Sequence, residues 1–173
     1  MVASAPSREA AVWAALAEIA DPEIPAISLV DLGVIGRIAF ESRAGGGERL
    51  SVELLPTFVG CPAIEVMRQA ISERLGELGV ADEVAVELSF SVPWTSDRIT
   101  PAGREALRSS GFAPPPQIGA SFGADLLTVL PIANCPYCAS RNTTLENPFG
   151  PTLCRAIYHC ADCRQPFEAF KPV

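Results

Sequence analysis

The sequence has no long apolar run and no signal-like start. A helix needs about 20 consecutive apolar residues to span a bilayer, and no segment approaches that length. The first eight residues, 1–8, also lack the basic stretch and apolar block of a secretory signal. We therefore expect a cytoplasmic protein with no membrane partner.

Basic side chains are also in short supply. Acidic residues outnumber them 20 to 13, which gives a formal net charge of −7. Proteins that bind nucleic acids usually gather Lys and Arg on one face, and no such cluster is visible, so we expect no nucleic-acid partner. Hydrophobic residues make up 49% of the 173 residues, enough for one good core and a small appendage.

Histidine occurs once, at His159. An enzyme that uses cysteine as a nucleophile normally pairs the thiol with a histidine base. His159 adjoins Cys160 near the end of the chain, far from Cys61, so the sequence argues against thiol catalysis. We expect His159 to be a strand residue and the protein not to be an enzyme by itself.

Periodic patterns predict a small α+β domain in the first two thirds of the chain. The order helix, strand, strand, helix, strand, short helix suits a two-layer sandwich with helices on one face of a sheet. The predicted helices are 8–20, 64–78 and 101–110, and the predicted strands are 34–41, 49–55 and 84–90. Helix 64–78 has the clearest apolar stripe, at Ile64, Met67, Ile71, Leu75 and Leu78.

Three successive prolines, 114–116, indicate a stiff spacer after this domain. We predict an α+β domain at 1–112, a proline-rich linker at 113–131 and a small C-terminal lobe at 132–173. Short β-forming runs at 143–145, 156–158 and 167–170 predict a hairpin and a third strand in that lobe.

Cys61 lies between the strand ending at residue 55 and the helix beginning near Pro62. Free N–H groups and the positive dipole end of a helix favour a thiolate. The position therefore predicts a pKa for Cys61 below the ordinary value of about 8.5. The alternative is that Cys61 is a small buried apolar residue, as many single cysteines are.

Three carboxylates precede this point in irregular chain. Asp21 and Glu23 lie in the segment Asp-Pro-Glu-Ile-Pro, where two prolines exclude regular structure, and Asp31 follows in Asp-Leu-Gly. Such a rigid loop can present carboxylates to a site. Loop carboxylates also often do no more than cap turns, so both interpretations stand.

Four cysteines near the C-terminus form two Cys-x-x-Cys pairs. Cys135 with Cys138 and Cys160 with Cys163 are separated by 21 residues. Two such pairs bring four thiolates around one ion, which predicts a structural zinc site. Iron or an iron–sulfur cluster in the same ligands is the alternative, because ligand type does not separate them. Cys154 is left over, and we expect a packed strand residue rather than a reactive thiol.

Several motifs in this order resemble one protein family. The motifs are Asp21-Pro-Glu-Ile-Pro25, Asp31-Leu-Gly33, Pro56-Thr57, Gly60-Cys61-Pro62, Pro93-Trp94-Thr95, Cys135-Pro-Tyr-Cys138, Phe149-Gly150, Cys154-Arg-Ala-Ile-Tyr158, Cys160-Ala-Asp-Cys163 and Pro166-Phe167. The first part resembles the iron–sulfur cluster assembly domain family. Domain and ribbon together resemble the PaaD (PaaJ) type of that family, accessory proteins of phenylacetyl-CoA epoxidase. Pro151 departs from the expected small polar residue and puts the local turn in doubt.

The resemblance implies an accessory or maturation factor for that epoxidase in aerobic phenylacetate degradation. Partners would be its di-iron oxygenase subunit or its iron–sulfur reductase. The cluster-handling residues would be Cys61, Thr57, Asp21, Glu23 and Asp31. A transient iron–sulfur cluster, shared between the Cys61 thiols of a homodimer, would be the cargo. The alternative is a non-catalytic scaffolding subunit of the epoxidase complex.

Overall fold

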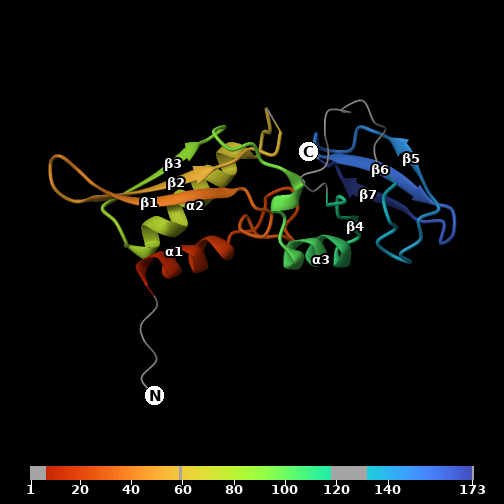
Figure 1. The fold of residues 1–173 in the computed structure, drawn as a ribbon, viewed down its shortest axis with the longest axis horizontal. Coiled ribbons are helices and arrows are strands. Elements are labelled where there is room, and N and C mark those ends of the chain that lie inside the picture. Colours follow the sequence, from red (N-terminus) through yellow and green to blue (C-terminus); the bar gives the residue numbers. More distant parts are fainter. Residues whose placement is uncertain (1–6, 59, 118–131, 173) are drawn as a thin grey trace, which may run out of the picture. The chain divides into compact units, whose positions relative to one another are not determined.

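The computed structural model describes residues 7–58, 60–117 and 132–172, and the chain divides into two compact units (Figure 1). The first unit comprises 1–56 and 60–93, and the second comprises 57–59 and 94–173. No helix among the described residues is long and apolar enough to cross a membrane.

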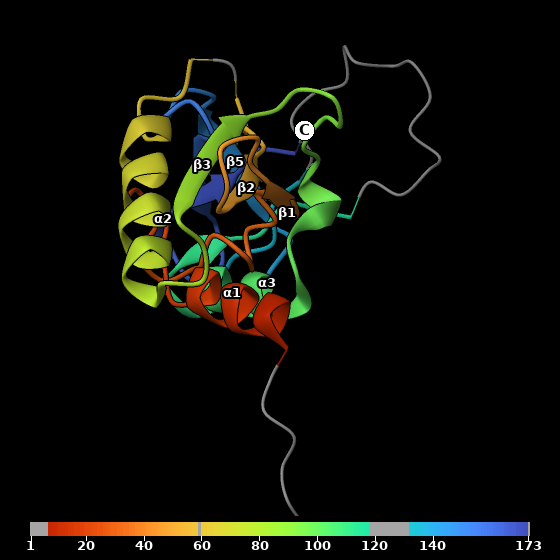
Figure 2. The same cartoon turned by 90° about the vertical axis from the view of Figure 1, so that its left-hand side faces the viewer.

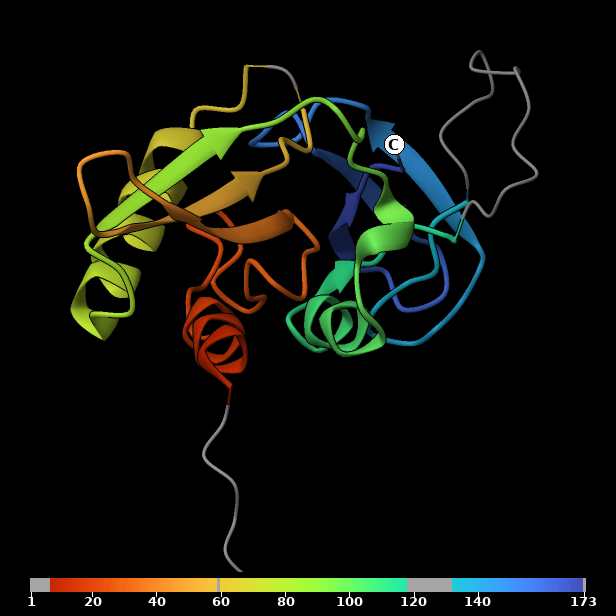
Figure 3. The same cartoon turned by 60° about the vertical axis from the view of Figure 1, so that its left-hand side comes forward.

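The first unit is one sheet with two helices on the same face (Figures 1 and 3). Its elements are α1 (Arg8–Ala17), β1 (Ile35–Ser42), β2 (Glu48–Leu54), α2 (Ile64–Leu78) and β3 (Glu83–Leu88). The strand order is β1-β2-β3. β1 runs antiparallel to β2, and β2 runs parallel to β3, with α2 as the crossover. The predicted α+β sandwich is confirmed.

The core of the first unit follows the two apolar periods of the sequence. Along β2, Leu50, Val52 and Leu54 are fully buried, while the residues between them are partly exposed. Along α2, Ile71 and Leu75 are fully buried against the sheet side. Burying an aliphatic side chain of this size contributes about 1.5–3 kcal/mol, so these few residues contribute much of the stability.

The first helix is shorter than the pattern predicts. It ends at Ala17 rather than Ala20. Ala20 instead forms an isolated antiparallel bridge with Ser28, and the amide of Asp21 donates to the carbonyl of Ile27 at 2.9 Å. Backbone pairing within the 20–28 loop therefore replaces the last helical turn. The apolar period alone could not reveal this, because Ile19 and Ala20 fit the helical stripe.

The second unit contains a four-stranded sheet of order β4-β7-β6-β5. Its elements are the 3-10 turn η1 (Ser96–Arg98), α3 (Pro101–Ser109), β4 (Phe112–Ala113), β5 (Thr143–Asn147), β6 (Arg155–Cys160) and β7 (Pro166–Phe170). The predicted hairpin and third strand are confirmed as β5, β6 and β7. β4 was not predicted, because two residues carry no periodic signal.

The structure groups α3 with the C-terminal strands, whereas the sequence places helix 101–110 in the first domain. β4 directly follows α3 and pairs in parallel with β7, Phe112 opposite Glu168 and Ala113 opposite Ala169. Arg104 in α3 also donates to the carbonyls of Ser96, at 2.6 Å, and Pro115. Most of the predicted linker, 118–131, lies outside the described residues, so its boundaries stay a prediction.

Replacement of the fully buried Ile71 on α2 tests the assignment of this core. We expect Ile71→Ala to lower the free energy of unfolding by about 2–4 kcal/mol, because it removes buried methylenes and leaves a cavity. Val66→Ala on the same helix is the matched control, since Val66 is exposed. Urea denaturation measures both variants, and equal effects would contradict the assigned helix face.

Candidate functional site

The four predicted ligand cysteines come together in the second unit. The sulfur atoms of Cys135, Cys138, Cys160 and Cys163 all lie within 4.8 Å of one another. Two of the separations, Cys135–Cys163 and Cys138–Cys160, are 3.6 Å. A disulfide would require about 2.05 Å, whereas a tetrahedral site with metal–sulfur bonds of about 2.3 Å has sulfur atoms about 3.8 Å apart. The thiol geometry therefore fits a four-coordinate metal ion.

Each Cys-x-x-Cys pair lies on the same kind of backbone turn. The amide of Ala139 donates to the carbonyl of Cys135, and the amide of Arg164 donates to the carbonyl of Cys160, both at 2.9 Å. Ala139 and Arg164 both have φ of 60°, in the left-handed region that costs a non-glycine residue about 1 kcal/mol or more. A left-handed residue directly follows each Cys-x-x-Cys pair, so the two turns share one backbone shape. In both turns this shape directs the two thiols toward the same point.

The four thiols differ in how readily they ionise. The pKa of Cys160 is lowered to about 7, chiefly because the backbone N–H of Cys163 donates to its sulfur. For Cys163 the N–H of Gln165 acts in the same direction, but burial and the neighbouring thiols outweigh it and raise its pKa to about 12. Four thiolates cannot coexist at this distance without a cation. The donor set therefore fits a divalent soft metal ion, whose binding would displace the remaining protons.

A polar clamp outside the sulfur atoms joins the two turns. The carboxylate of Asp162 accepts from the Ser140 hydroxyl at 2.5 Å and from the Asn142 side-chain amide at 2.9 Å. These two bonds hold the pKa of Asp162 below its usual value. Sequence reasoning missed this clamp. Groups that orient metal ligands in this way tune the affinity of a site.

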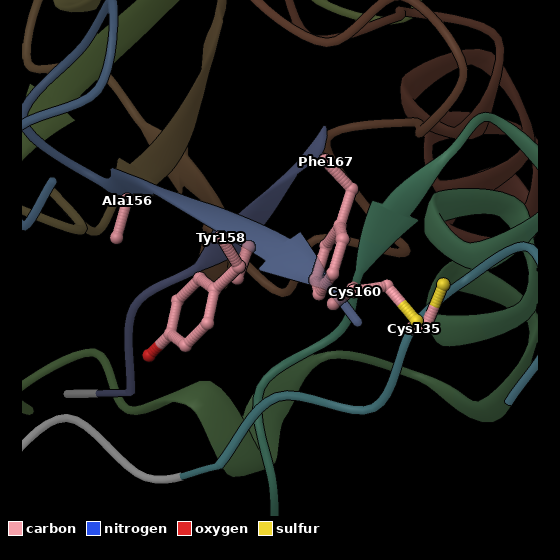
Figure 4. Close-up of a cluster of buried hydrophobic side chains, with 7 residues drawn as sticks. Cys135, Ala156, Tyr158, Cys160 and Phe167 are labelled. Carbon is pink, nitrogen blue, oxygen red and sulfur yellow. The ribbon is translucent and has the colours of Figure 1, made fainter. Parts of the chain in front are cut away.

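Two of the four thiols belong to the small core of the second unit (Figure 4). Cys135 and Cys160 are buried with Tyr158 and Phe167, whose rings stack at 5.7 Å. Cys138 is exposed, and Cys163 is half-buried. A metal ion bound to all four thiols would therefore link this small core to the exposed side of the two turns. A core of this size is too small to stabilise the lobe by itself.

The other two residues that the sequence singled out in this lobe lie outside the thiol group. His159 is a strand residue, as predicted, and pairs with Thr144 and Pro166 across the sheet. Cys154 is buried just before β6, with its sulfur 3.1 Å from the Thr152 hydroxyl. Neither adds a fifth ligand to the described cluster.

Cys61, in the first unit, precedes α2 by two residues. The predicted span 64–78 of α2 is confirmed, but its cap is Ala63, without a side-chain cap, and Cys61 and Pro62 lie before the helix and not at its cap and first position. The reason is local: residues 61–64 form a tighter turn, in which the amide of Ile64 donates to the carbonyl of Cys61 at 3.4 Å. The half-buried Cys61 sulfur accepts the backbone N–H groups of Ala63 and Ile64. Its thiol is therefore reachable from solvent and held in place.

The predicted lowering of the Cys61 pKa is wrong in sign. Burial raises the pKa, and the negative charges of Glu23 and Asp21 raise it further. The N–H groups of Ala63 and Ile64 lower it, but not enough to reverse the sum. Cys61 is therefore a thiol at neutral pH. The sequence missed this because the carboxylates come from a segment almost forty residues away.

Two of the three predicted carboxylates, Asp21 and Asp31, make hydrogen bonds within their own turns. One oxygen of the buried Asp21 accepts the amides of Glu23 and Ile24, at 2.9 and 2.7 Å. Asp31 accepts the Ser28 hydroxyl at 2.8 Å. Asp21 and Glu23 also act on Cys61, so turn capping does not exclude a site role for them. The site roles of Asp31 and of Thr57, which belongs to the second unit, stay predictions.

Comparison with known proteins matches both halves of the chain. Residues 9–88 match the family model of iron–sulfur cluster assembly proteins, and residues 124–171 match that of the PaaD zinc beta ribbon domain. The Escherichia coli (strain K12) protein provisionally named as the D-type subunit of 1,2-phenylacetyl-CoA epoxidase is 41% identical over 96% of this chain and 94% of its own length.

A second curated protein and one solved structure each match a little over half of the chain. The Fe-S protein maturation auxiliary factor YitW of Bacillus subtilis (strain 168) is 24% identical, over 56% of this chain and 89% of its own length. A crystal structure of a domain of unknown function from Bacillus anthracis superposes with a TM-score of 0.51 at 20% identity, over 58% of this chain and 92% of that one. This last likeness shows the fold alone.

Elemental analysis of single-cysteine variants tests the metal centre. We expect Cys138→Ser to lose most of the metal that the unmodified protein carries at one ion per chain, because three thiolates no longer close the tetrahedron. Cys154→Ser is the matched control and keeps the full metal content, since Cys154 lies outside the cluster. Equal metal content in the two variants would refute the ligand assignment.

Alkylation of Cys61 tests its electrostatic setting. We expect the rate of modification by iodoacetamide to rise with pH through a pKa above the ordinary value of about 8.5. Glu23→Gln removes one of the charges that oppose thiolate formation, so the rate at neutral pH increases. Glu41→Gln is the control, because Glu41 lies near the C-terminal end of β1 and is not one of the charges that raise the pKa of Cys61. Mass spectrometry of the Cys61 peptide measures the rates, and a slower reaction in Glu23→Gln would overturn the assignment.

Proposed function

The chain belongs to the PaaD family, the D-type subunits of phenylacetyl-CoA epoxidase, and on this basis we propose that it is an accessory maturation factor of that epoxidase. In this role it assists assembly of an iron–sulfur cluster or iron centre during aerobic phenylacetate degradation. Its partners are the iron–sulfur reductase or the di-iron oxygenase subunit. It acts on other proteins and carries out no oxygenation itself.

The observation that carries this proposal is the thiol of Cys61. It is held by two backbone N–H groups at the start of α2, is half-buried, and has Asp21 and Glu23 close enough to raise its pKa. This thiol lies in the part of the chain that matches the iron–sulfur cluster assembly model. A thiol of this kind, in such a domain, is suited to handling a metal-containing cargo.

A raised pKa suits a residue that must bind a cluster and then release it. Iron must displace the proton of Cys61 to bind, so the proton competes with the cargo. Asp21 and Glu23 help to raise this pKa, so at neutral pH the proton keeps the affinity of the thiol for the cargo low. Clusters usually take four protein thiolates. One thiol, or two thiols from two copies of the chain, therefore holds a cluster only transiently.

Zinc is the ion that we propose for the four-cysteine cluster. Its role there is structural, because four protein ligands leave no open coordination position for chemistry. The match to a zinc ribbon family model supports zinc over iron, and the thiol separations fit one tetrahedral ion. The ribbon is then a rigid structural lobe, and the iron–sulfur cluster or iron binds at Cys61 instead.

A scaffolding role is the second candidate, and one surface of the ribbon favours it. Phe149 and Leu153, between β5 and β6, expose 73% and 53% of their surface. The turn that carries them is held rigidly, because Gly150 packs so closely on Arg155 that no Cβ would fit. Exposed apolar side chains on a rigid turn are typical of docking sites.

Exchange of Cys61 for serine separates the two functions. We expect Cys61→Ser, coexpressed with the epoxidase subunits, to leave the fold and zinc content intact and to abolish most of the epoxidase activity and the iron content of the client. Cys154→Ser is the control and supports normal activity. Normal iron content and activity with Cys61→Ser would refute maturation through this thiol. Loss of activity with Phe149→Ala under the same conditions would then support the scaffold.

A further inference from the structure

The two sheets of the described structure have four edge strands, and three of them are protected. β1 has a register shift between Ile35 and Ile38, and the Arg8 guanidinium covers the ring of Phe40 at 4.0 Å. β5 has a register shift near Leu145, and β4 is only two residues long. Bulges, short length and covering charges are the usual devices that prevent an edge strand from pairing with another chain.

The fourth edge, β3, is regular and open. Among the described residues it pairs with β2 alone, in continuous register from Glu83 to Leu88. It contains no proline, lysine or bulge. Its two carboxylates are paired with arginines of the same sheet unit: Glu83 with Arg43, just after β1, at 3.3 Å, and Glu87 with Arg49 of β2 at 3.0 Å. The edge therefore offers backbone groups without a repelling net charge.

Apolar side chains follow this open edge. Val84, Val86 and Leu88 alternate on the helix-covered face, and Phe90 continues the row. Leu88 and Phe90 expose 39% and 60% of their surface, and Val66 on the adjacent turn of α2 exposes 55%. We call Val66, Val84, Leu88 and Phe90 the β3-edge surface. Water-exposed apolar rows beside an unpaired strand are where sheets extend.

A groove runs between β3 and α2, which lie next to each other in Figure 2. Its volume is about 560 Å³, and its walls include Val66, Gln69 and Ser72 from α2 and Val84 and Val86 from β3. The charged residues of α2 beside it, Glu65 and Arg68, pair with each other at 2.9 Å. The charges beside the groove are therefore paired within the chain, and the groove favours neither an acidic nor a basic partner. Such a surface can face a copy of itself without charge repulsion.

We propose that two copies of this chain pair antiparallel through their β3 strands, so that the two three-stranded sheets become one six-stranded sheet. The proposal depends on the sheet edge alone. It therefore stands or falls separately from the maturation role, although a dimer is what would bring two Cys61 thiols into one assembly.

The side chains of β3 select one register for this pairing. A two-fold axis at Val86 sets Val84 opposite Leu88, Ala85 opposite Glu87 and Glu83 opposite Ser89. Within β3 every apolar residue of the helix-covered face then meets an apolar residue, and no carboxylate faces another. The neighbouring two-fold register, centred on Ala85, sets Glu83 opposite Glu87 and is disfavoured by like charge. A sequence that permits one symmetric register and penalises the next is well suited to self-pairing.

Sedimentation equilibrium of the purified protein tests the proposal. We expect the mass to rise with concentration from 18.3 kDa toward twice that value at about 200 µM. Because each copy carries a net charge of −7, raising the salt from about 0.15 M to about 0.5 M screens the repulsion and strengthens association. Hydrogen exchange of amides 83–89 slows as the concentration increases.

Two matched variants locate the interface. Leu88 and Leu145 lie on edge strands of different sheets and expose 39% and 38% of their surface. We expect Leu88→Lys to weaken association at least about 10-fold, because an edge lysine blocks pairing, and Leu145→Lys to dimerise normally. Val66→Glu is the second variant if circular dichroism shows that Leu88→Lys is misfolded.

The proposal is overturned if the unmodified protein stays at 18.3 kDa over the whole concentration range. It is equally overturned if a dimer forms that neither folded variant of the β3-edge surface weakens, since another surface then makes the contact. A mass increase that Leu145→Lys abolishes while Leu88→Lys does not would move the interface to the ribbon sheet.

Discussion

The second unit depends on the meeting of four thiols. Cys135 and Cys138 reach the cluster from one turn, and Cys160 and Cys163 from another, with all four sulfur atoms within 4.8 Å. Four thiolates this close would repel one another, and the raised pKa of Cys163 reflects burial together with that repulsion. The two turns, the Asp162 clamp and the small aromatic core hold the four sulfur atoms in place. The lobe therefore combines a small apolar core with a four-thiol site whose geometry fits a metal ion.

The first unit is stabilised by apolar packing between its sheet and its helices. Its sheet and two helices bury an apolar core that includes Leu16, Leu50 and Ile71. Cys61 lies at the margin of that core, where partial burial and two carboxylates oppose ionisation and two backbone N–H groups favour it. The balance leaves a thiol that can be deprotonated by an incoming cation.

Much of the fold could be predicted from the sequence, because apolar periods report burial directly. The strands β1 to β3 and the helix α2 were all predicted to within two residues, and the ribbon strands followed from short β-forming runs. The errors fall where backbone hydrogen bonds between distant segments decide the outcome. The end of α1 is replaced by the bridge from Ala20 to Ser28, and β4 exists only because β7 is there to pair with it.

The grouping of the four ribbon thiols and the place of Cys61 just before a helix could be predicted from local patterns, because Cys-x-x-Cys spacing and a proline-flanked helix start need no distant contacts. The charge state of Cys61 could not be predicted in this way. The local helix end favours a thiolate, but Asp21 and Glu23 arrive from another loop, and burial depends on everything packed around the sulfur. A pKa is set by all charges and all solvent exclusion within several ångströms, and no local pattern in the chain records that sum.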